Sequence, residues 1–482
     1  MSYDLVVKNG TIVTHTETYQ ADIGIKGEKI AAIGTDLLAA AGNGKKPQVI
    51  DAKGLYVMPG GIDVHVHLQL PFCGTVSADD FETGTRAAAR GGVTTVVDFA
   101  GQDPEKGLWA GIESRMKEAE KKVCVDYSLH GMITKWNDNI RKELKKCMDK
   151  GVTSFKMFTI YEKEGWNSDD AAFFSALTES AQTGATICAH AESEKVMNYL
   201  IDLYHKQTKQ LGAYGHALSR PNFIEEEAIQ RLAKWAEVTG GKLYIVHMST
   251  GEGANQIRAA QERGARVFAE TCPQYLVLND EVFKDKKNGH LYGTCPQIKK
   301  KADNARLWKG LMDGEVSVVS TDTCTFNKKQ KSMWNGDFTK IPWGMPGVET
   351  LLPALYTHGV LGKKFDINHY VRLISTNPAR MFGMFPRKGT IAIGSDADLN
   401  IFHPTKAKKI DYKELATNCD WSPFQGESLA GFPVFTVSRG EIVVDKGKWI
   451  GKVGRGKFIP RGIGEDVYIP ANPRRELAAA RK

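Results

Sequence analysis

The composition of this 482-residue chain, 42% hydrophobic and 25% charged, is typical of a globular protein with more than one folded unit. Its net charge of +8 comes from 64 basic and 56 acidic residues that are interspersed, so no basic run indicates nucleic-acid binding. No apolar run has the length of a membrane span, and we expect no membrane partner. No export signal is visible, and the eight cysteines form no CxxC pair, which together favour reduced thiols in the cytoplasm.

Short alternating apolar runs fill residues 1 to 58 and are interrupted at Asn9-Gly10, Gly27 and Gly54. Alternation with a period of two is typical of strands, and glycine-containing interruptions are hairpin signals. We therefore expect a small antiparallel sheet at the start of the chain.

The pattern changes after Pro59-Gly60, where apolar β-branched runs alternate with amphipathic segments, as in a parallel sheet built from βα units. The eight predicted strands are the run that begins at residue 60 and those near 94–97, 126–130, 154–158, 186–190, 243–247, 266–270 and 317–320. The predicted helices cover 79–90, 107–121, 140–150, 169–183, 224–239, 253–263 and 302–313. Eight such units predict an α/β fold, a (β/α)8 TIM barrel. A doubly wound open sheet is the alternative, but it requires a Gly-rich phosphate turn that is missing here.

Antiparallel character returns from about residue 387. We expect the two ends of the chain to pair into one small β-sandwich-like domain, made of residues 1–58 and 385–455. Residues 59–384 would form the catalytic barrel with a binuclear metal site. The stretch 456–482 is rich in Arg, Lys, Gly and Pro, and is expected to be an arm that lies on a neighbouring subunit or is disordered.

The first barrel strand ends in His65-Val66-His67. Side chains alternate along a strand, so both imidazoles point the same way and could bind one metal ion. The alternative is a pair of ordinary hydrogen-bonded histidines, and this motif alone does not decide between them.

Other predicted strands also end in groups that can bind metal, at the rim where barrels place their functional residues. These are Lys156, His190, His247 and Asp322. Singly, the histidines could be core residues, Lys156 could extend to solvent and Asp322 could cap a helix. Together they favour two divalent ions that share a water, because the set exceeds one tetrahedral Zn²⁺ site. A desolvated Lys156 could add CO₂ and become a bridging carbamate.

The sequence resembles the cyclic amidohydrolases of the dihydropyrimidinase and D-hydantoinase (phenylhydantoinase) group, in the amidohydrolase superfamily, over essentially its whole length. The matching stretches are residues 59–67, 80–88, 154–156, 270–275, 336–342, 381–383 and 394–398.

This resemblance implies that His65, His67 and Asp322 hold one ion and that His190 and His247 hold the other. Carbamylated Lys156 would bridge two divalent ions, with Zn²⁺ as the default metal. Further roles are implied for Asp322 as the proton carrier, for Tyr161 as the oxyanion-stabilising residue, and for backbone groups near Cys295 and Trp343 as substrate contacts. Leu70 and Phe72, in the loop after His67, would join Tyr161 in an apolar pocket for the exocyclic group of the ring.

The implied activity is metal-dependent hydrolytic opening of a cyclic amide or imide, a 5,6-dihydropyrimidine or a 5-substituted hydantoin, to an N-carbamoyl amino acid by a homotetramer. An allantoinase-like hydrolase and a non-enzymatic scaffold of the same fold are the alternatives, and the intact ligand set favours an enzyme. Gln69 stands where a dihydroorotase needs arginine, which disfavours that activity. The chain departs from the family pattern at Gln69, Thr323, Trp343 and 296–299. These departures leave undecided which cyclic substrate the enzyme opens.

Overall fold

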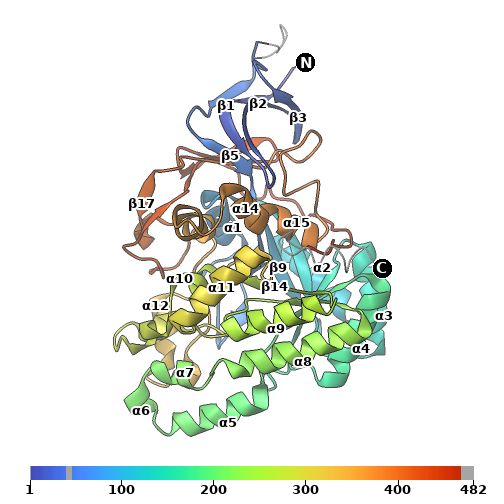
Figure 1. Cartoon of the computed structure of the whole chain (residues 1–482), viewed down its shortest axis with the longest axis vertical. Coiled ribbons are helices and arrows are strands. Elements are labelled where there is room, and N and C mark those ends of the chain that lie inside the picture. Colours follow the sequence, from blue (N-terminus) through green and yellow to red (C-terminus); the bar gives the residue numbers. More distant parts are fainter. Residues whose placement is uncertain (1, 40–45, 468–482) are drawn as a thin grey trace.

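Two sheets organise the computed structural model, which describes residues 2–39 and 46–467. Figure 1 shows a small β-rich unit at the top and a larger unit below it, in which strands are surrounded by helices. Among the described residues, no helix combines the length and the apolar character needed to cross a bilayer.

The larger unit contains an eight-stranded sheet whose neighbouring strands are parallel and follow one another in chain order. Its strands are β6 (Gly61–Val66), β9 (Val93–Gly101), β10 (Asp126–Met132), β11 (Ser154–Phe158), β12 (Thr186–His190), β13 (Lys242–Ile245), β14 (Val267–Thr271) and β15 (Val318–Val319). The sheet closes where the His67 amide donates to the Thr323 carbonyl at 2.7 Å, beside a Val66–Thr323 bridge. This closed order is the predicted (β/α)8 barrel and excludes the doubly wound alternative.

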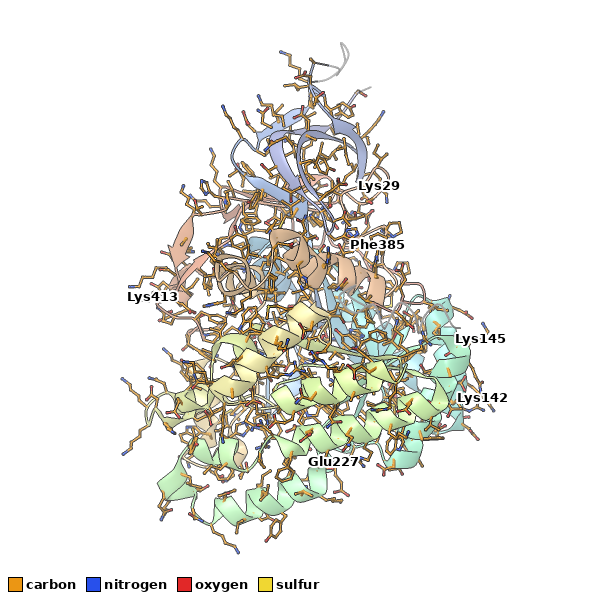
Figure 2. The ribbon with its side chains drawn as sticks, viewed as in Figure 1. Lys29, Lys142, Lys145, Glu227, Phe385 and Lys413 are labelled. Atoms are coloured by element: carbon orange, nitrogen blue, oxygen red, sulfur yellow. The ribbon has the colours of Figure 1, made fainter. Side chains whose placement is uncertain are left out.

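The helices that cover the barrel lie close to the predicted ranges. They are α1 (Phe81–Arg90), α2 (Leu108–Ala119), α3 (Asp138–Asp149), α4 (Asp170–Thr183), α8 (Phe223–Thr239), α9 (Gly251–Glu262) and α11 (Lys301–Asp313). Local chemistry sets several ends: Asp80 and Thr83 form a capping box at α1, and Gly184 ends α4 in the left-handed conformation. Figure 2 shows Lys142 and Lys145 on the outer face of α3, as expected for a solvated basic surface.

The remaining α-helices of the described residues and four short strands lie around this barrel. The helices are α5 (Glu194–His205), α6 (Thr208–Leu211), α7 (Tyr214–Leu218), α10 (Pro273–Val277), α12 (Lys328–Lys331), α13 (Leu351–Leu355), α14 (Ile367–Val371) and α15 (Asn377–Met381). The strands are β7 (Pro71–Phe72), β8 (Thr75–Val76), β17 (Ala407–Lys409) and β18 (Ser428–Ala430). Strands β7 and β8 form a hairpin in the loop that follows His67.

The second sheet joins the two ends of the chain, as the sequence predicts. Its first strands are β1 (Leu5–Val13), β2 (Thr18–Lys26), β3 (Lys29–Gly34), β4 (Gln48–Asp51) and β5 (Tyr56–Pro59). The later ones are β16 (Leu399–Phe402), β19 (Pro433–Ser438), β20 (Glu441–Asp445) and β21 (Lys448–Trp449). The two sets meet where β5 pairs antiparallel with β16. We propose residues 1–58 and 385–455 as one folding unit; of these, residues 1 and 40–45 lie outside the described residues.

The N-terminal strands differ from the expected antiparallel sheet in two ways. Strand β1 pairs antiparallel with β2 but parallel with β4 and β5, so the sheet is mixed. Asn9-Gly10 is not a turn: it lies inside β1 at a shift of register, with Asn9 at a φ of 61°. A Cβ at Gly10 would lie 2.6 Å from Val57, which explains why glycine stands there.

The segment after the second sheet returns to the barrel. The Ile459 amide donates to the Tyr127 carbonyl at 2.7 Å, and Arg461 donates to the Ser128 hydroxyl at 2.8 Å. Residues 456–467 therefore lie on the barrel of their own chain, at the end opposite the C-terminal ends of the strands. The rest of the proposed arm, 468–482, lies outside the described residues.

Candidate active site

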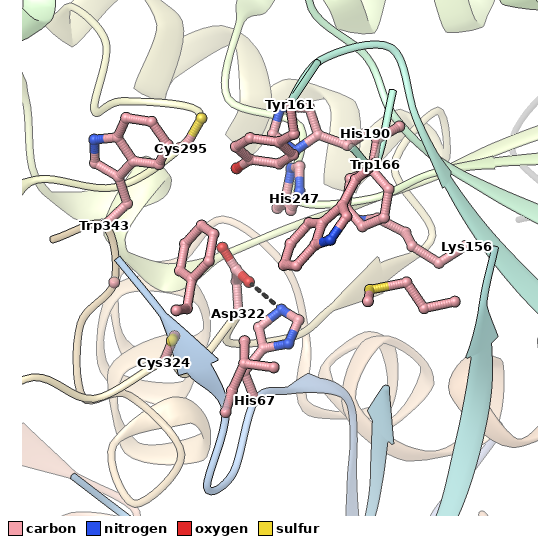
Figure 3. A pocket seen from close by; sticks show the side chains of 15 residues that line it. His67, Lys156, Tyr161, Trp166, His190, His247, Cys295, Asp322, Cys324 and Trp343 are labelled. Carbon is pink, nitrogen blue, oxygen red and sulfur yellow. Dashed lines mark ion pairs between the residues drawn. The ribbon is translucent and has the colours of Figure 1, made fainter. Parts of the chain in front are cut away.

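A pocket opens at the C-terminal ends of the barrel strands, the rim where the sequence predicts the site (Figure 3). The empty space within it, part of it open to solvent, is about 540 Å³. Its wall includes the predicted site residues His67, Leu70, Phe72, Lys156, Tyr161, His190, His247, Cys295, Asp322 and Trp343. His65 lies beneath it and is fully buried. The structure thus brings every predicted site residue to one place.

Asp322 joins His65, in β6, and His67, directly after it. Its Oδ1 atom lies 3.2 Å from His65 Nε2 and 3.3 Å from His67 Nε2. Figure 3 shows the Asp322 carboxylate directed at the His67 ring. One atom from each of these residues lies within 4.8 Å of the other two, a spacing that one metal ion can span.

His190 and His247 form the neighbouring part of the site, with ring centroids 4.5 Å apart. The His65 ring lies 5.2 Å from that of His247, so the two parts are continuous. Lys156 is buried in the same wall, with Nζ 5.5 Å from the Phe99 ring and 5.2 Å from the Phe158 ring. Burial lowers the pKa of Lys156 to about 8.

Buried ring nitrogens without hydrogen bonds gather in this cluster. Nδ1 of His67 and Nδ1 of His247 are buried and make no hydrogen bond, and Nε2 of His65, also buried, has the Asp322 carboxylate at 3.2 Å as its ion-pair contact. By contrast His130, in β10, bonds Ser154 at 2.6 Å and the Val64 carbonyl at 2.9 Å. Burial also lowers the pKa values of His65 and His247 well below the usual value, which favours the neutral imidazole that binds metal. The donor set therefore fits divalent metal ions.

Three site residues have strained backbones. The φ angles of Tyr161, His247 and Asp322 are 75°, 38° and 53°, in the left-handed region that non-glycine residues rarely adopt. Such strain persists only where the surroundings enforce it, and it concentrates at functional sites. In each case it aims a side chain from a strand end into the pocket.

Buried carboxylates behind the histidines were missed by sequence reasoning. Glu270, at the end of β14, bonds His65 Nδ1 and accepts from the His247 amide at 3.1 Å. Glu192 lies 2.7 Å from His190 Nε2. Burial acts to raise the pKa of Glu192, but the hydrogen bond and charge of His190, with the charges of Arg220 and Lys299, lower it to about 2. Carboxylates in these positions fix the ring orientation of metal-binding histidines. The sequence signal that could have identified Glu270 and Glu192 was a glutamate at, or just after, the end of a buried strand.

The strand closure depends on a third carboxylate, Asp63. It accepts from the Thr321 hydroxyl at 2.6 Å and from the Thr321 amide at 3.1 Å, which fastens the segment before Asp322 to β6. Thr323, one of the positions at which the chain departs from the family pattern, lies in this segment. Its carbonyl accepts a hydrogen bond from the His67 amide. Any residue offers that carbonyl, so the backbone contact does not depend on the residue type.

Aromatic rings cover the pocket. Phe72 stacks on Trp166 with centroids 5.6 Å apart, and Tyr161 lies 5.7 Å from Trp166 and 5.9 Å from Trp343. Figure 3 shows Trp343 and Cys295 on the wall opposite Lys156. The Cys295 thiol lies 3.4 Å from Glu192 and beside the Tyr161 hydroxyl. Trp166, in the loop that follows Lys156, also lines the pocket. Met132, Phe158 and Cys324 line it too and were missed, because nothing in their local sequence marks them.

Comparison with known proteins supports this description. The sequence matches the Amidohydrolase family over residues 56–443. It is 41% identical to a D-hydantoinase of Geobacillus stearothermophilus over 95% of this chain and 96% of that protein. It is 36% identical to a D-phenylhydantoinase of Escherichia coli O1:K1 over 95% of this chain and 98% of that protein.

Solved structures agree with this assignment. The crystal structure of dihydropyrimidinase from Brevibacillus agri NCHU1002 superposes with a TM-score of 0.92 at 38% identity, covering 95% of this chain and 99% of that chain. These findings confirm the resemblance drawn from the sequence motifs and the predicted fold class. The chain belongs to the amidohydrolase family, as a hydrolase of the hydantoinase and dihydropyrimidinase group.

Proposed function

We propose that this amidohydrolase opens a cyclic amide or imide by hydrolysis, a 5,6-dihydropyrimidine or a 5-substituted hydantoin, and releases an N-carbamoyl amino acid. The observation that carries the proposal is the group of His65, His67 and Asp322, with ligand atoms within 4.8 Å of one another, at the base of an aromatic pocket that His190 and His247 also line. The names of its relatives support this substrate class. The retained ligand set favours an enzyme over a non-enzymatic scaffold of the same fold.

The proposed metal site has two halves. His65, His67 and Asp322 would hold one divalent ion, and His190 and His247 the other. Lys156 would bridge them as a carbamate, since its amine lies in a buried, apolar part of the wall that His67, His190, His247 and Asp322 also line. Zn²⁺ is the proposed metal, because imidazole suits it. When bound, the ions would lower the pKa of a shared water and polarise the substrate carbonyl.

The chain's own groups have separate tasks in this proposal. Asp322 accepts a proton from the attacking water and passes it to the ring nitrogen as the carbon–nitrogen bond breaks. The Tyr161 hydroxyl donates a hydrogen bond to the carbonyl oxygen as that oxygen gains negative charge. Backbone groups near Cys295 and Trp343 hold the ring. This binding mode tolerates the unusual side chains at the two positions, because the backbone is the same for any residue.

The aromatic side chains of the pocket wall indicate which substituents on the substrate ring would fit. Leu70, Phe72, Trp166 and Trp343 present apolar surface where a group attached to the ring would lie. An aromatic substituent would bury its own apolar area against these rings and gain from ring-to-ring contact. We therefore expect aryl-substituted hydantoins to be better substrates than unsubstituted rings.

A substrate screen tests the function. The purified, metal-loaded protein is offered dihydrouracil, hydantoin, 5-phenylhydantoin, 5-methylhydantoin and allantoin, and ring opening is followed by the appearance of the carbamoyl product. We expect turnover of the hydantoins, with the highest kcat/KM for the 5-phenyl compound. Turnover of allantoin alone would indicate an allantoinase instead. No turnover of any ring, in a protein that binds no metal, would favour a scaffold.

We also propose a homotetramer in the cytoplasm. Support for assembly comes from α5, where the apolar side chains of Val196, Tyr199 and Leu203 are 45%, 67% and 41% exposed and share one helix face. All eight cysteines are free thiols, which suits a reducing compartment. Light scattering of the purified protein would report the number of chains.

A further inference from the structure

Lys331 is a buried lysine outside the proposed catalytic set. It ends α12, and its side chain is fully enclosed. The ammonium group donates to the Pro342 carbonyl at 2.6 Å and to the Gly293 carbonyl at 3.0 Å. These two acceptors are far apart in the chain, so the lysine ties together two segments that no sheet connects.

Both segments lead directly into the pocket wall. Gly293 is two residues before Cys295, and Pro342 immediately precedes Trp343. The Gly293 carbonyl also accepts from the Gly344 amide at 2.9 Å, so it receives the lysine and the opposite segment together. The backbone at Gly344 in turn packs so closely on the Cys324 carbonyl that a Cβ would lie 2.2 Å from it. Figure 3 shows Cys295, Trp343 and Cys324 along this side of the pocket.

Burying the Lys331 ammonium in this space has a large cost in desolvation free energy. Aromatic rings flank it, with Phe326 at 5.8 Å and Trp421 at 5.9 Å, and burial lowers the pKa of Lys331 to about 7. A methionine could make similar apolar contacts without the desolvation cost. What an apolar side chain could not supply is the pair of hydrogen bonds to Gly293 and Pro342.

We propose that Lys331 is a positioning residue for substrate: it holds the backbone of 293–295 and 342–344 at the spacing that lets both segments contact one ring. The proposal rests on the proposed function, in which backbone groups near Cys295 and Trp343 bind the ring. Loss of Lys331 should weaken substrate binding while leaving the metal-binding residues in place, because the ammonium contacts none of them.

The chain offers a matched control at the other end of the barrel. Lys242, in β13, is also buried and also donates to two backbone carbonyls, those of Gly464 at 3.0 Å and Glu465 at 2.6 Å. Its partners belong to the segment that lies against the opposite end of the barrel. Lys242→Met therefore removes the same kind of bond, together with an ion pair to Asp466 at 3.5 Å, without touching the pocket.

The test compares Lys331→Met, Lys331→Arg and Lys242→Met with the unaltered protein. We expect Lys331→Met to raise KM for the best ring substrate at least tenfold, with bound metal unchanged and kcat reduced less than threefold. Lys331→Arg, which keeps the donors, should recover most of the loss. Lys242→Met should lower thermal stability but leave KM unchanged. The proposal is overturned if Lys331→Met and Lys242→Met have the same KM. Lys331→Gln, which keeps one amide donor group, replaces the methionine variant if that protein does not fold.

Hydrogen exchange provides a readout that needs no substrate. Amides in peptides covering 293–295 and 342–344 should exchange faster in Lys331→Met than in Lys242→Met or the unaltered protein. Unchanged exchange would refute the positioning role even if the enzyme is active. Faster exchange in a protein that opens no ring would instead refute the proposed function and keep the structural part of the inference.

Discussion

Two buried polar clusters lie at opposite ends of the barrel and differ in one respect. At the end that faces the small sheet, the Lys388 ammonium contacts Asp126 and Asp398 at 2.6 Å each and Asp396 at 3.0 Å. Arg439 adds a further bond to Asp126 at 2.8 Å. At the pocket end, histidine nitrogens that could accept or donate remain without partners.

The difference separates a structural role from a functional one. Buried charge is stable only when it is paired and hydrogen-bonded, and the Lys388 cluster meets this condition within the chain. The pocket cluster does not, so its nitrogens fit partners from outside, namely metal ions. Groups of possible metal ligands within 4.8 Å of one another occur in both places: Asp126, Asp396 and Asp398 in one, and Asp322 with His65 and His67 in the other. Proximity alone therefore does not identify a metal site, and the pocket cluster is the place where close ligands and unfilled bonding capacity coincide.

The largest expected effect comes from removing the proposed bridge. Lys156→Ala deletes the group that would join the two halves of the site. We expect bound metal to fall below one ion per chain, and activity to fall by more than the roughly hundredfold that loss of an outer hydrogen-bond partner can cost. Metal analysis and ring-opening assays measure this, with Lys145→Ala on the exposed face of α3 as the control. Added short carboxylates should restore part of the activity. A variant that keeps its metals and full activity would refute the bridge.

Breaking the other cluster should affect stability instead. Lys388→Met leaves buried carboxylates without their common partner, and we expect the free energy of unfolding to fall by about 3–5 kcal/mol. Urea unfolding measures the change, and KM should remain as in the unaltered protein. Equal free energies of unfolding for Lys388→Met and the unaltered protein would show that the ion pairs of Lys388 do not outweigh the desolvation cost of burying its ammonium.

The Lys388 cluster also predicts that the folded protein loses stability at acid pH. Burial acts to raise the pKa of Asp396, but Lys388 and Lys29 lower it to about 2, below its unfolded value of about 3.9. A lowered folded pKa means that this contribution to stability is complete above pH 4 and is lost as pH falls toward 2. Urea unfolding between pH 5 and 2 should show this loss, and it should be smaller in Lys388→Met. Figure 2 places Lys29 near the junction of the two units.

The smallest of these effects concerns one hydroxyl. Tyr161→Phe keeps the ring that packs on Trp166 and removes only the donor to the developing oxyanion. We expect kcat to fall about a hundredfold, with metal content and thermal stability unchanged. Steady-state kinetics with 5-phenylhydantoin measures it. A fall in metal content of the same size would mean that the tyrosine acts on the metal site rather than on the oxyanion.

The fold was predictable where local pattern and burial agree. The parallel strands β9 to β14 are buried on both faces, so continuous apolar runs mark them, and capping residues mark the helices between them. The N-terminal sheet was harder, because Asn9-Gly10 has the local signature of a turn. Only its contact with Val57 shows that the glycine accommodates a neighbouring strand.

The site was predictable only in part, for a related reason. Residues such as His65 and Asp322 stand at strand ends, and the barrel geometry gathers all strand ends at one rim. Glu270 also stands at a strand end, but its role depends on which ring nitrogen it faces. Cys324 lies in a loop, where no periodic pattern indicates the direction of a side chain.

The sequence by itself determined the barrel, the pairing of the two chain ends and the set of residues that converge on the pocket, because strand periodicity and strand order specify these directly. Only the tertiary structure decided which buried polar groups have partners. The bonds of Lys331 to Gly293 and Pro342, of Lys388 to Asp126, and of Glu270 to His65 depend on where each side chain ends in space. Those distances arise from the packing of segments far apart in the chain, which local sequence does not encode.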